Sequence, residues 1–334
     1  MNTQVVLCGI ALLCVVNISI AQPDIEHQLL LHDSMVQISS ELDHGSTGTG
    51  TGVVITPEYV ATNCHILANT KGVSINKNGD AFKPTAIKAD WKHDLCMLKF
   101  DPLPFKPVKM RDSSTLKYEE EVFSVGYPIG FNVPQSSFGS VKAIYPFDGS
   151  FIIRTSASFG LGSSGGALFD QQFNLIGITS FKSPGPQGYF YSMPVEWIKN
   201  TMKSKEVFTL NTNEVPFWAL EETKRPYFMR VVIPYQNHDW LELKRLASEW
   251  STLESNNSDS WYFLGVSEYE SNDLSHAKLH LSKATQINSR HLDALVLLAQ
   301  LAFKEKDLTS FQKIKDAVKN IDEDEYNALE KQTK

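Results

Sequence analysis

The hydrophobic pattern of this chain changes once along its length, and the change divides it into two parts. Through residues 52–192, short apolar runs of strand length recur between clusters of Gly, Pro and Asn. Many short strands without intervening helices predict antiparallel sheets that close or stack to cover their edges. Beyond residue 238 the apolar residues recur with a helical period. The predicted fold class is therefore multidomain, an all-β part followed by an all-α part.

A glycine-rich turn, Gly162 to Leu168, lies between two apolar strands of the β part. Its glycines allow backbone angles that a side chain forbids, so main-chain amides can point to one place beside the Ser164 hydroxyl. Acyl transfer needs this arrangement, a nucleophile next to donors aimed at the oxyanion. Because such turns are common, the turn alone is also consistent with a plain hairpin.

A serine nucleophile needs an imidazole that accepts its proton and a buried carboxylate that orients the imidazole. Two upstream stretches supply these groups: His65 ends an apolar strand, and Asp94 opens an alternating one. The order along the chain is His, Asp, Ser, with 29 residues from His65 to Asp94 and 70 from Asp94 to Ser164. Together the three stretches predict a catalytic triad.

These three stretches resemble the motifs of the trypsin-like serine proteases, and within them the HtrA/Deg branch of bacterial and organellar proteases. The resemblance covers roughly residues 30–203, and the Gly-Thr repeat before residue 52 and the run Tyr191 to Pro194 add to it. It implies two six-stranded β-barrels with the active site in the cleft between them. It also implies site roles. The stretches that carry the resemblance are Ala61 to His65, His93 to Leu98 and Gly162 to Leu168. The implied roles are His65 as general base, Asp94 as the carboxylate that orients it, and Ser164 as nucleophile. The amides of Gly162 and Ser164, with Ser163 between them, would form the oxyanion hole.

The family's positions also imply a substrate pocket. Its base corresponds to Ser158, where no carboxylate would attract Lys or Arg, and its neighbouring wall to Thr179, Ser180 and Phe181. An aromatic ring in this wall would fill part of the pocket. We therefore expect cleavage after small or medium apolar residues such as Val, Ala or Leu.

The sequence departs from the HtrA pattern in two places. Ser163 stands where that branch usually has Asn, which makes Ser163 a lesser candidate for the nucleophile. HtrA proteins usually carry a PDZ domain after the protease domain, and this sequence shows no glycine-rich carboxylate-binding loop there. The predicted domains are a signal peptide at 1–21, a protease domain at 22–203, a linker at 204–237 and a helical domain at 238–334.

The helical domain contains one clear repeat with the spacing of a tetratricopeptide repeat. Adding 34 residues finds a second, degenerate copy. Paired helices of this kind stack into a surface that binds peptides, whereas a cap that only stabilises the protease is the alternative. The residues of the first copy are Trp261, Leu264, Gly265, Ala277, Leu281 and Ala284, and those of the second are Leu295, Leu298, Ala299, Phe311, Lys315 and Val318.

The amino terminus predicts export. An apolar run from Val5 to Ile20 ends in small residues before Gln22, as in a signal peptide cleaved after Ala21, although no Lys or Arg precedes the run. An uncleaved membrane anchor is the alternative. Cleavage would leave Cys64 and Cys96, which could form a disulfide in an oxidising compartment or remain two buried thiols.

The composition argues against a nucleic acid partner, because the net charge is −7 and the chain has no surplus of basic residues. No metal-ligand spacing occurs and no cofactor is implied. We expect an exported bacterial serine endopeptidase, periplasmic or secreted and free of the membrane after cleavage, that acts on proteins or peptides and binds a protein partner through its helices. The alternative is a catalytically silent or latent protease fold that serves as a scaffold. The sequence leaves the oligomeric state open.

Overall fold

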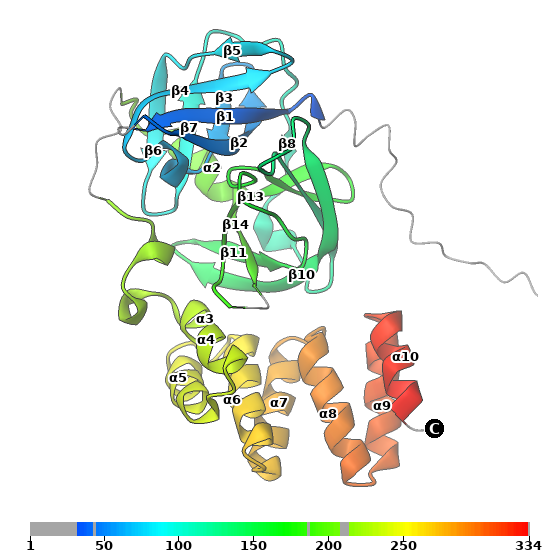
Figure 1. Ribbon diagram of the computed structural model, residues 1–334. Helices are drawn as coiled ribbons and strands as arrows, with labels where there is room; N and C mark the ends of the chain where they lie inside the picture. The colour runs from blue at the N-terminus through cyan, green and yellow to red at the C-terminus, as the bar shows by residue number, and fades with distance from the viewer. Residues whose placement is uncertain (1–31, 43–44, 186–187, 208–213, 333–334) are drawn as a thin grey trace, which may run out of the picture.

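The computed structural model describes residues 32–42, 45–185, 188–207 and 214–332 of the 334. Two β-sheets come first along the chain, and a row of helices follows them (Figure 1). The predicted fold class, an all-β part followed by an all-α part, is confirmed. The signal peptide expected at 1–21 lies outside the described residues.

The first sheet contains seven antiparallel strands in the order β5-β4-β1-β2-β3-β7-β6. Asn78 and Gly79 both have positive φ angles, 55° and 91°, and form the tight hairpin between β4 and β5. Apolar side chains of alternate residues, among them Ile38 and Val54, fill a buried core. The strands are β1 (Met35–Leu42), β2 (Thr47–Thr56), β3 (Tyr59–Thr62), β4 (Thr70–Lys77), β5 (Asp80–Phe82), β6 (Ala86–Asp90) and β7 (Leu95–Lys99).

The first sheet differs from the closed six-stranded barrel that we expected. Within the described residues no pairing joins its edge strands β5 and β6, so the sheet is a half-barrel. Pro84 lies between these two strands and has no amide hydrogen to donate to a ladder. Strand β6 instead makes a single bridge, from Ile87 to Val207.

The second sheet closes into a barrel, as expected. Strand β12 pairs with both β9 and β13, which completes the ring β12-β9-β10-β11-β14-β13, and β8 adds to β13 in parallel. Asp148 and Gly149, with φ angles of 44° and 74°, form the tight turn between β10 and β11. The strands are β8 (Lys109–Met110), β9 (Glu121–Gly126), β10 (Gln135–Phe147), β11 (Ser150–Thr155), β12 (Ala167–Asp170), β13 (Asn174–Lys182) and β14 (Phe190–Pro194).

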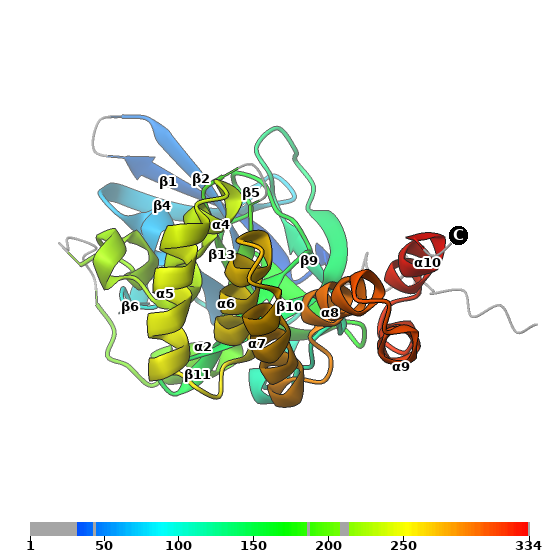
Figure 2. The same cartoon turned by 90° about the horizontal axis from the view of Figure 1, so that it is seen from below.

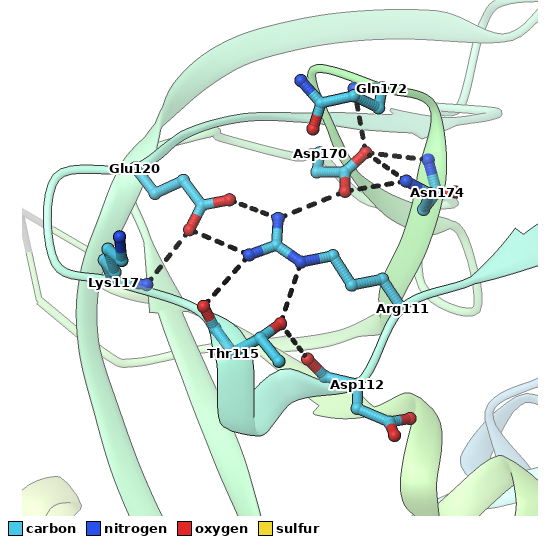
Figure 3. A network of polar contacts seen from close by, with 8 residues as sticks. All are labelled: Arg111, Asp112, Thr115, Lys117, Glu120, Asp170, Gln172 and Asn174. Carbon is cyan, nitrogen blue, oxygen red and sulfur yellow. Dashed lines mark hydrogen bonds and ion pairs between the residues drawn. The ribbon is translucent and has the colours of Figure 1, made fainter.

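A polar network fixes the hairpin between β12 and β13, just beyond the glycine-rich turn (Figure 3). Asp170 is buried and accepts hydrogen bonds from the main-chain amides of Gln172 and Asn174 at 2.9 and 2.8 Å. Arg111 bridges Asp170, at 3.2 Å, to Glu120, and the bond to Glu120 raises the pKa of Arg111 despite its partial burial. The network holds the strand that follows the turn.

The stretch from residue 204 to 237, expected as a linker, holds several short helices within its described residues. Pro216 and Pro226 stand at the N-cap positions of η3 and α3, and Pro234 lies inside α4, so the prolines do not keep the segment extended. Phe217 and Phe228 are buried, 2% and 4% exposed, so the segment packs against its neighbours. The elements around it are α2 (Val195–Thr201), η3 (Phe217–Ala219), η4 (Glu222–Lys224), α3 (Tyr227–Arg230) and α4 (Val232–Gln236).

The carboxyl-terminal helices are consecutive antiparallel neighbours joined by short turns. Asp239 caps α5 by accepting a hydrogen bond from the Glu242 amide at 3.1 Å. Gly265 on α6 lets α7 approach closely, because a Cβ there would lie 2.7 Å from Leu281. The helices are α5 (Trp240–Leu253), α6 (Ser258–Glu270), α7 (Leu274–Ile287), α8 (Leu292–Lys304), α9 (Leu308–Lys319) and α10 (Glu323–Gln332).

The helices contact the second barrel through a buried cluster of polar side chains. Tyr145 on β10 donates a hydrogen bond to Asp259 on α6 at 2.5 Å, and Arg154 on β11 lies 3.9 Å from the same carboxylate. Phe228 on α3 stacks on the Tyr145 ring with centroids 4.3 Å apart. Figures 1 and 2 show α6 beside the part of the barrel that carries β10 and β11.

Candidate active site

The structure brings His65 and Asp94 into direct contact. His65 lies on η1 (Cys64–Leu67), a short 3-10 helix after β3, and not on the end of a strand as expected. Its Nδ1 atom lies 2.8 Å from Asp94 Oδ2, and its main-chain amide donates to Asp94 Oδ1 at 2.9 Å. Asp94 is fully buried and has a φ of 58° just before β7. A disulfide between Cys64 and Cys96, one of the two states left open by the sequence, joins the two segments.

Further donors saturate the Asp94 carboxylate. The Ser180 hydroxyl donates to Oδ2 at 2.6 Å, and the Trp218 indole N–H donates to the same oxygen at 3.2 Å. Because the Asp94 carboxylate accepts a hydrogen bond from Nδ1–H of His65, the Nε2 atom of that ring is the one left to act as a base.

Ser164 lies in a tight turn between β11 and β12. Gly162 and Gly165 have positive φ angles, 91° and 81°, and neither has room for a Cβ atom. A Cβ at Gly162 would lie 2.7 Å from the Tyr127 carbonyl oxygen, and one at Gly165 would lie 2.2 Å from the Thr51 carbonyl oxygen. The Ser164 hydroxyl donates to the Ser180 carbonyl at 3.3 Å. Among the described residues no hydrogen bond joins it to His65. Such bonds are often long or misaligned without substrate.

A hydrogen bond fixes the orientation of the peptide between Leu161 and Gly162. The Leu161 carbonyl accepts a hydrogen bond from the Ile129 amide at 2.8 Å. Because the carbonyl and N–H of a trans peptide point in opposite directions, the Gly162 N–H points away from Ile129. The Ser163 amide donates to the Gly160 carbonyl at 3.0 Å, whereas the amides of Gly162 and Ser164 have no acceptor within the described part of the chain.

Thr51 of the Gly-Thr repeat connects the first sheet to this turn. Its amide donates to the Ser164 carbonyl at 2.8 Å, and its hydroxyl donates to the Gly162 carbonyl at 2.8 Å. The same hydroxyl accepts from the Tyr127 amide at 2.8 Å. Sequence analysis placed the repeat only at the start of a strand, because nothing local to it shows a contact 113 residues away in the chain.

The structure places the residues expected to line the pocket in different surroundings. Thr179 donates from its hydroxyl to the Ser163 carbonyl at 2.9 Å, and Ser180 bonds Asp94. Phe181 is buried and stacks on Tyr191 with centroids 4.6 Å apart. Ser158 is exposed, its hydroxyl 3.0 Å from that of Ser137. Their pocket roles stay predictions.

Three side chains that sequence analysis did not single out contact one another, and one of them, Phe159, shortly precedes the turn in the chain. The rings of Phe159 and Phe190 meet edge to face with centroids 5.1 Å apart, and the Lys182 ammonium lies 5.6 Å from the Phe190 ring. Gly188 leaves room for the Lys182 chain, whose Cε would lie 1.7 Å from a Cβ at that position. One sequence signal could have drawn attention to Lys182. Side chains alternate along a strand, so Lys182 lies on the face of β13 opposite to that of Phe181.

Comparison with known proteins accords with this geometry. Residues 50–178 match the trypsin-like peptidase domain family. The periplasmic pH-dependent serine endoprotease DegQ of Escherichia coli K12 is 33% identical over 148 residues, which cover 41% of this chain and 32% of that protein. A probable periplasmic serine endoprotease, DegP-like, of Pseudomonas savastanoi pv. phaseolicola is 28% identical over 156 residues, covering 44% and 32%.

Residues 50–178 are therefore similar to the trypsin-like serine protease domains of HtrA/Deg-type proteases. The chain matches about a third of the length of these curated relatives. The crystal structure of a protease from M. tuberculosis in its active form aligns with a TM-score of 0.51 and 21% identity, over 63% of this chain and 100% of that one. This likeness establishes the chymotrypsin fold of the protease domain.

Two further observations concern the described residues alone. Within them, no group of three or more His, Cys, Asp or Glu side chains is arranged to hold a metal ion. None of the helices in that part of the chain has the length and apolar character that crossing a membrane requires.

Proposed function

We propose that the chain is a serine endopeptidase in which Ser164, His65 and Asp94 form the catalytic triad. The contact between the buried Asp94 carboxylate and His65 Nδ1, at 2.8 Å, carries this proposal. It is supported by the Leu161 carbonyl, which is bound to Ile129 and so leaves the Gly162 amide for an oxyanion.

In this mechanism Ser164 attacks the scissile carbonyl while His65 Nε2 takes its proton. In this step the Ser164 hydroxyl exchanges its hydrogen bond to the Ser180 carbonyl for one to His65. The amides of Gly162 and Ser164 hold the oxyanion, and His65 returns the proton to the leaving amine. Water then releases the acyl-enzyme by the same steps in reverse order.

We further propose cleavage after small or medium apolar residues. The rings of Phe159 and Phe190 contact each other, and the Lys182 ammonium lies over the Phe190 ring. We take these side chains as part of the pocket lining, where their bulk favours a shallow pocket. The Lys182 ammonium would repel a basic side chain at the cleavage site. A peptide library with one varied position before the bond tests this, and a preference for Arg would contradict it.

The decisive experiment compares the chain from Gln22 onward with its Ser164→Ala and Ser163→Ala variants in casein cleavage and fluorophosphonate labelling. We expect the wild type and Ser163→Ala to cleave and to be labelled, and Ser164→Ala to lose activity by about 10⁶-fold, the loss seen for an isolated serine removal in such triads. Loss with Ser163→Ala alone would move the nucleophile to the neighbouring residue.

A latent or silent scaffold is the second candidate, favoured by the Ser164 bond to the Ser180 carbonyl at 3.3 Å. A wild-type chain that neither cleaves nor is labelled would support this candidate. A chain that becomes active after a peptide is added would indicate a latent protease.

We propose export to the periplasm or outside the cell, because the amino terminus has a signal-like run and the curated relatives named above are described as periplasmic. Detection of a mature chain beginning at Gln22 tests this. We also propose that the helical region binds a protein partner or substrate, with tetratricopeptide-like helix pairs as the binding element.

A further inference from the structure

Trp218 lies on η3, outside the stretch that matches the peptidase family, yet it contacts the triad directly. Its indole N–H donates to Asp94 Oδ2 at 3.2 Å. The edge of its ring meets the His65 imidazole, with centroids 5.5 Å apart and planes at 89°. A side chain from the segment after the second barrel therefore contacts two residues of the proposed triad.

The contacts of Trp218 fix its orientation. Its ring stacks on Phe181 of β13 with centroids 5.4 Å apart and planes at 21°. Stacking on one side and the hydrogen bond at the N–H leave the indole one position in which both are satisfied. Phe181 is itself buried and stacked on Tyr191, so the column of rings reaches into the barrel core.

The neighbouring Phe217 anchors η3 to both sheets. Its amide donates to the Lys92 carbonyl at 3.0 Å, in the turn that leads to Asp94. Its buried ring lies 4.7 Å from Phe147 at the end of β10 and 6.0 Å from Phe181. The segment is therefore held on the side from which the indole reaches Asp94.

The Asp94 Oδ2 atom takes three donors, from His65, Ser180 and Trp218. Each donor restricts the rotation of the carboxylate, and hydrogen bonds to a charged group are among the stronger ones. Loss of the indole donor would remove one of the bonds that restrict the carboxylate and so loosen its alignment with His65 Nδ1. The imidazole would then lose part of the orientation on which proton transfer depends.

We propose that Trp218 is a positioning residue for the triad, so that the segment joining the two parts of the chain belongs to the catalytic unit. This inference rests on the proposed protease function. Trp218 acts through Asp94 and His65 and takes no part in bond making.

The test uses the chain from Gln22 onward with Trp218 replaced by Phe, or by the benzothienyl analogue of tryptophan, which keeps the bicyclic ring and has sulfur in place of N–H. Trp261→Phe is the matched control, because Trp261 is also half-buried and loses an indole bond, to the Ser255 carbonyl at 2.8 Å, far along the chain. Kinetic constants for a peptide substrate and the far-downfield proton resonance of the His65 to Asp94 hydrogen bond are measured for each.

For both Trp218 replacements we expect kcat to fall about tenfold while KM stays within about twofold, the size expected for one donor to a charged group. The downfield resonance should shift or broaden, and Trp261→Phe should change neither readout. Unchanged kcat and an unchanged resonance would overturn the inference.

The two readouts separate this inference from the proposed function. If the wild type neither cleaves nor is labelled by fluorophosphonate, the protease function fails, and the resonance still decides whether Trp218 orders Asp94 and His65. If the Phe variant does not fold, the benzothienyl variant, which keeps the packing, decides alone.

Discussion

At the scale of single residues, Thr51 shows how the first sheet supports a turn that belongs to the second barrel. It is fully buried, and its amide and hydroxyl bind the carbonyls on either side of Ser163 in the turn, those of Gly162 and Ser164. Its hydroxyl is also the acceptor for the Tyr127 amide. The turn therefore depends on a residue from the other sheet.

We predict that Thr51→Val lowers stability by about 1–3 kcal/mol, because it leaves the buried Tyr127 amide and Gly162 carbonyl without their hydroxyl partner. Fluorophosphonate labelling of Ser164 should also slow. Urea unfolding and labelling rates measure both effects. Thr49→Val is the control, since Thr49 lies on the same strand and is half exposed. Equal effects of the two substitutions would contradict this role for Thr51.

At the scale of elements, the disulfide ties η1 to β7. Cys64 and Cys96 are 32 residues apart, and the loop they close includes β4, β5 and β6. Closing a loop of this length limits the unfolded chain, which stabilises the fold by about 3–4 kcal/mol in the chain-entropy model.

We predict that the double substitution Cys64→Ser and Cys96→Ser lowers the free energy of unfolding by about 3–4 kcal/mol. Reduction of the wild type should produce a similar loss, and the variant should not respond to reductant. Urea unfolding with and without dithiothreitol measures this. A variant as stable as the oxidised wild type would show that no disulfide forms in solution.

The strands and helices were largely predictable because their signals are local. Alternating apolar residues after Asp94 marked β7, a continuous apolar run marked β11, and a helical period marked the region beyond residue 238. The state of the two cysteines, the open first sheet and the position of Trp218 depend on contacts between distant segments. The prolines at 216 and 226 were interpreted as signals of a linker, whereas in the structure each precedes a short helix. Proline occurs in both settings, and the sequence does not show which of them applies. The roles of His65, Asp94 and Ser164 stay predictions until activity is measured.

At the scale of the whole molecule, a buried ionic cluster joins the helices to the second barrel. Asp259 is fully buried, and its carboxylate lies 3.0 Å from His291 Nε2. This contact is electrostatic rather than a hydrogen bond, because Nε2 has no hydrogen-bond partner of good geometry among the described residues. Burial alone would raise the pKa of Asp259, but Arg154, His291 and Tyr145 outweigh it and lower the pKa below its usual value. Charged side chains of the barrel and of the helices therefore interact directly at the buried interface between them.

We predict that Asp259→Asn destabilises the protein by about 3–5 kcal/mol, because it leaves the Arg154 charge buried without its partner. The difference from the wild type should depend on pH. A carboxyl with a lowered pKa stabilises the fold above its unfolded pKa of about 3.9, and that contribution is lost as pH falls through the folded value. Thermal unfolding of both proteins from neutral pH downward measures this. A difference that stays constant below pH 4 would contradict the assignment.

The place of Trp218 also bears on how such a chain can be inherited or recombined. A gene fusion that joined a different carboxyl-terminal domain directly after Lys203 would retain all three motif residues and lose the indole that contacts Asp94. A junction placed after Leu220 would retain both. Exchange of carboxyl-terminal domains among relatives of this chain should therefore tolerate breakpoints beyond η3 and select against those before it.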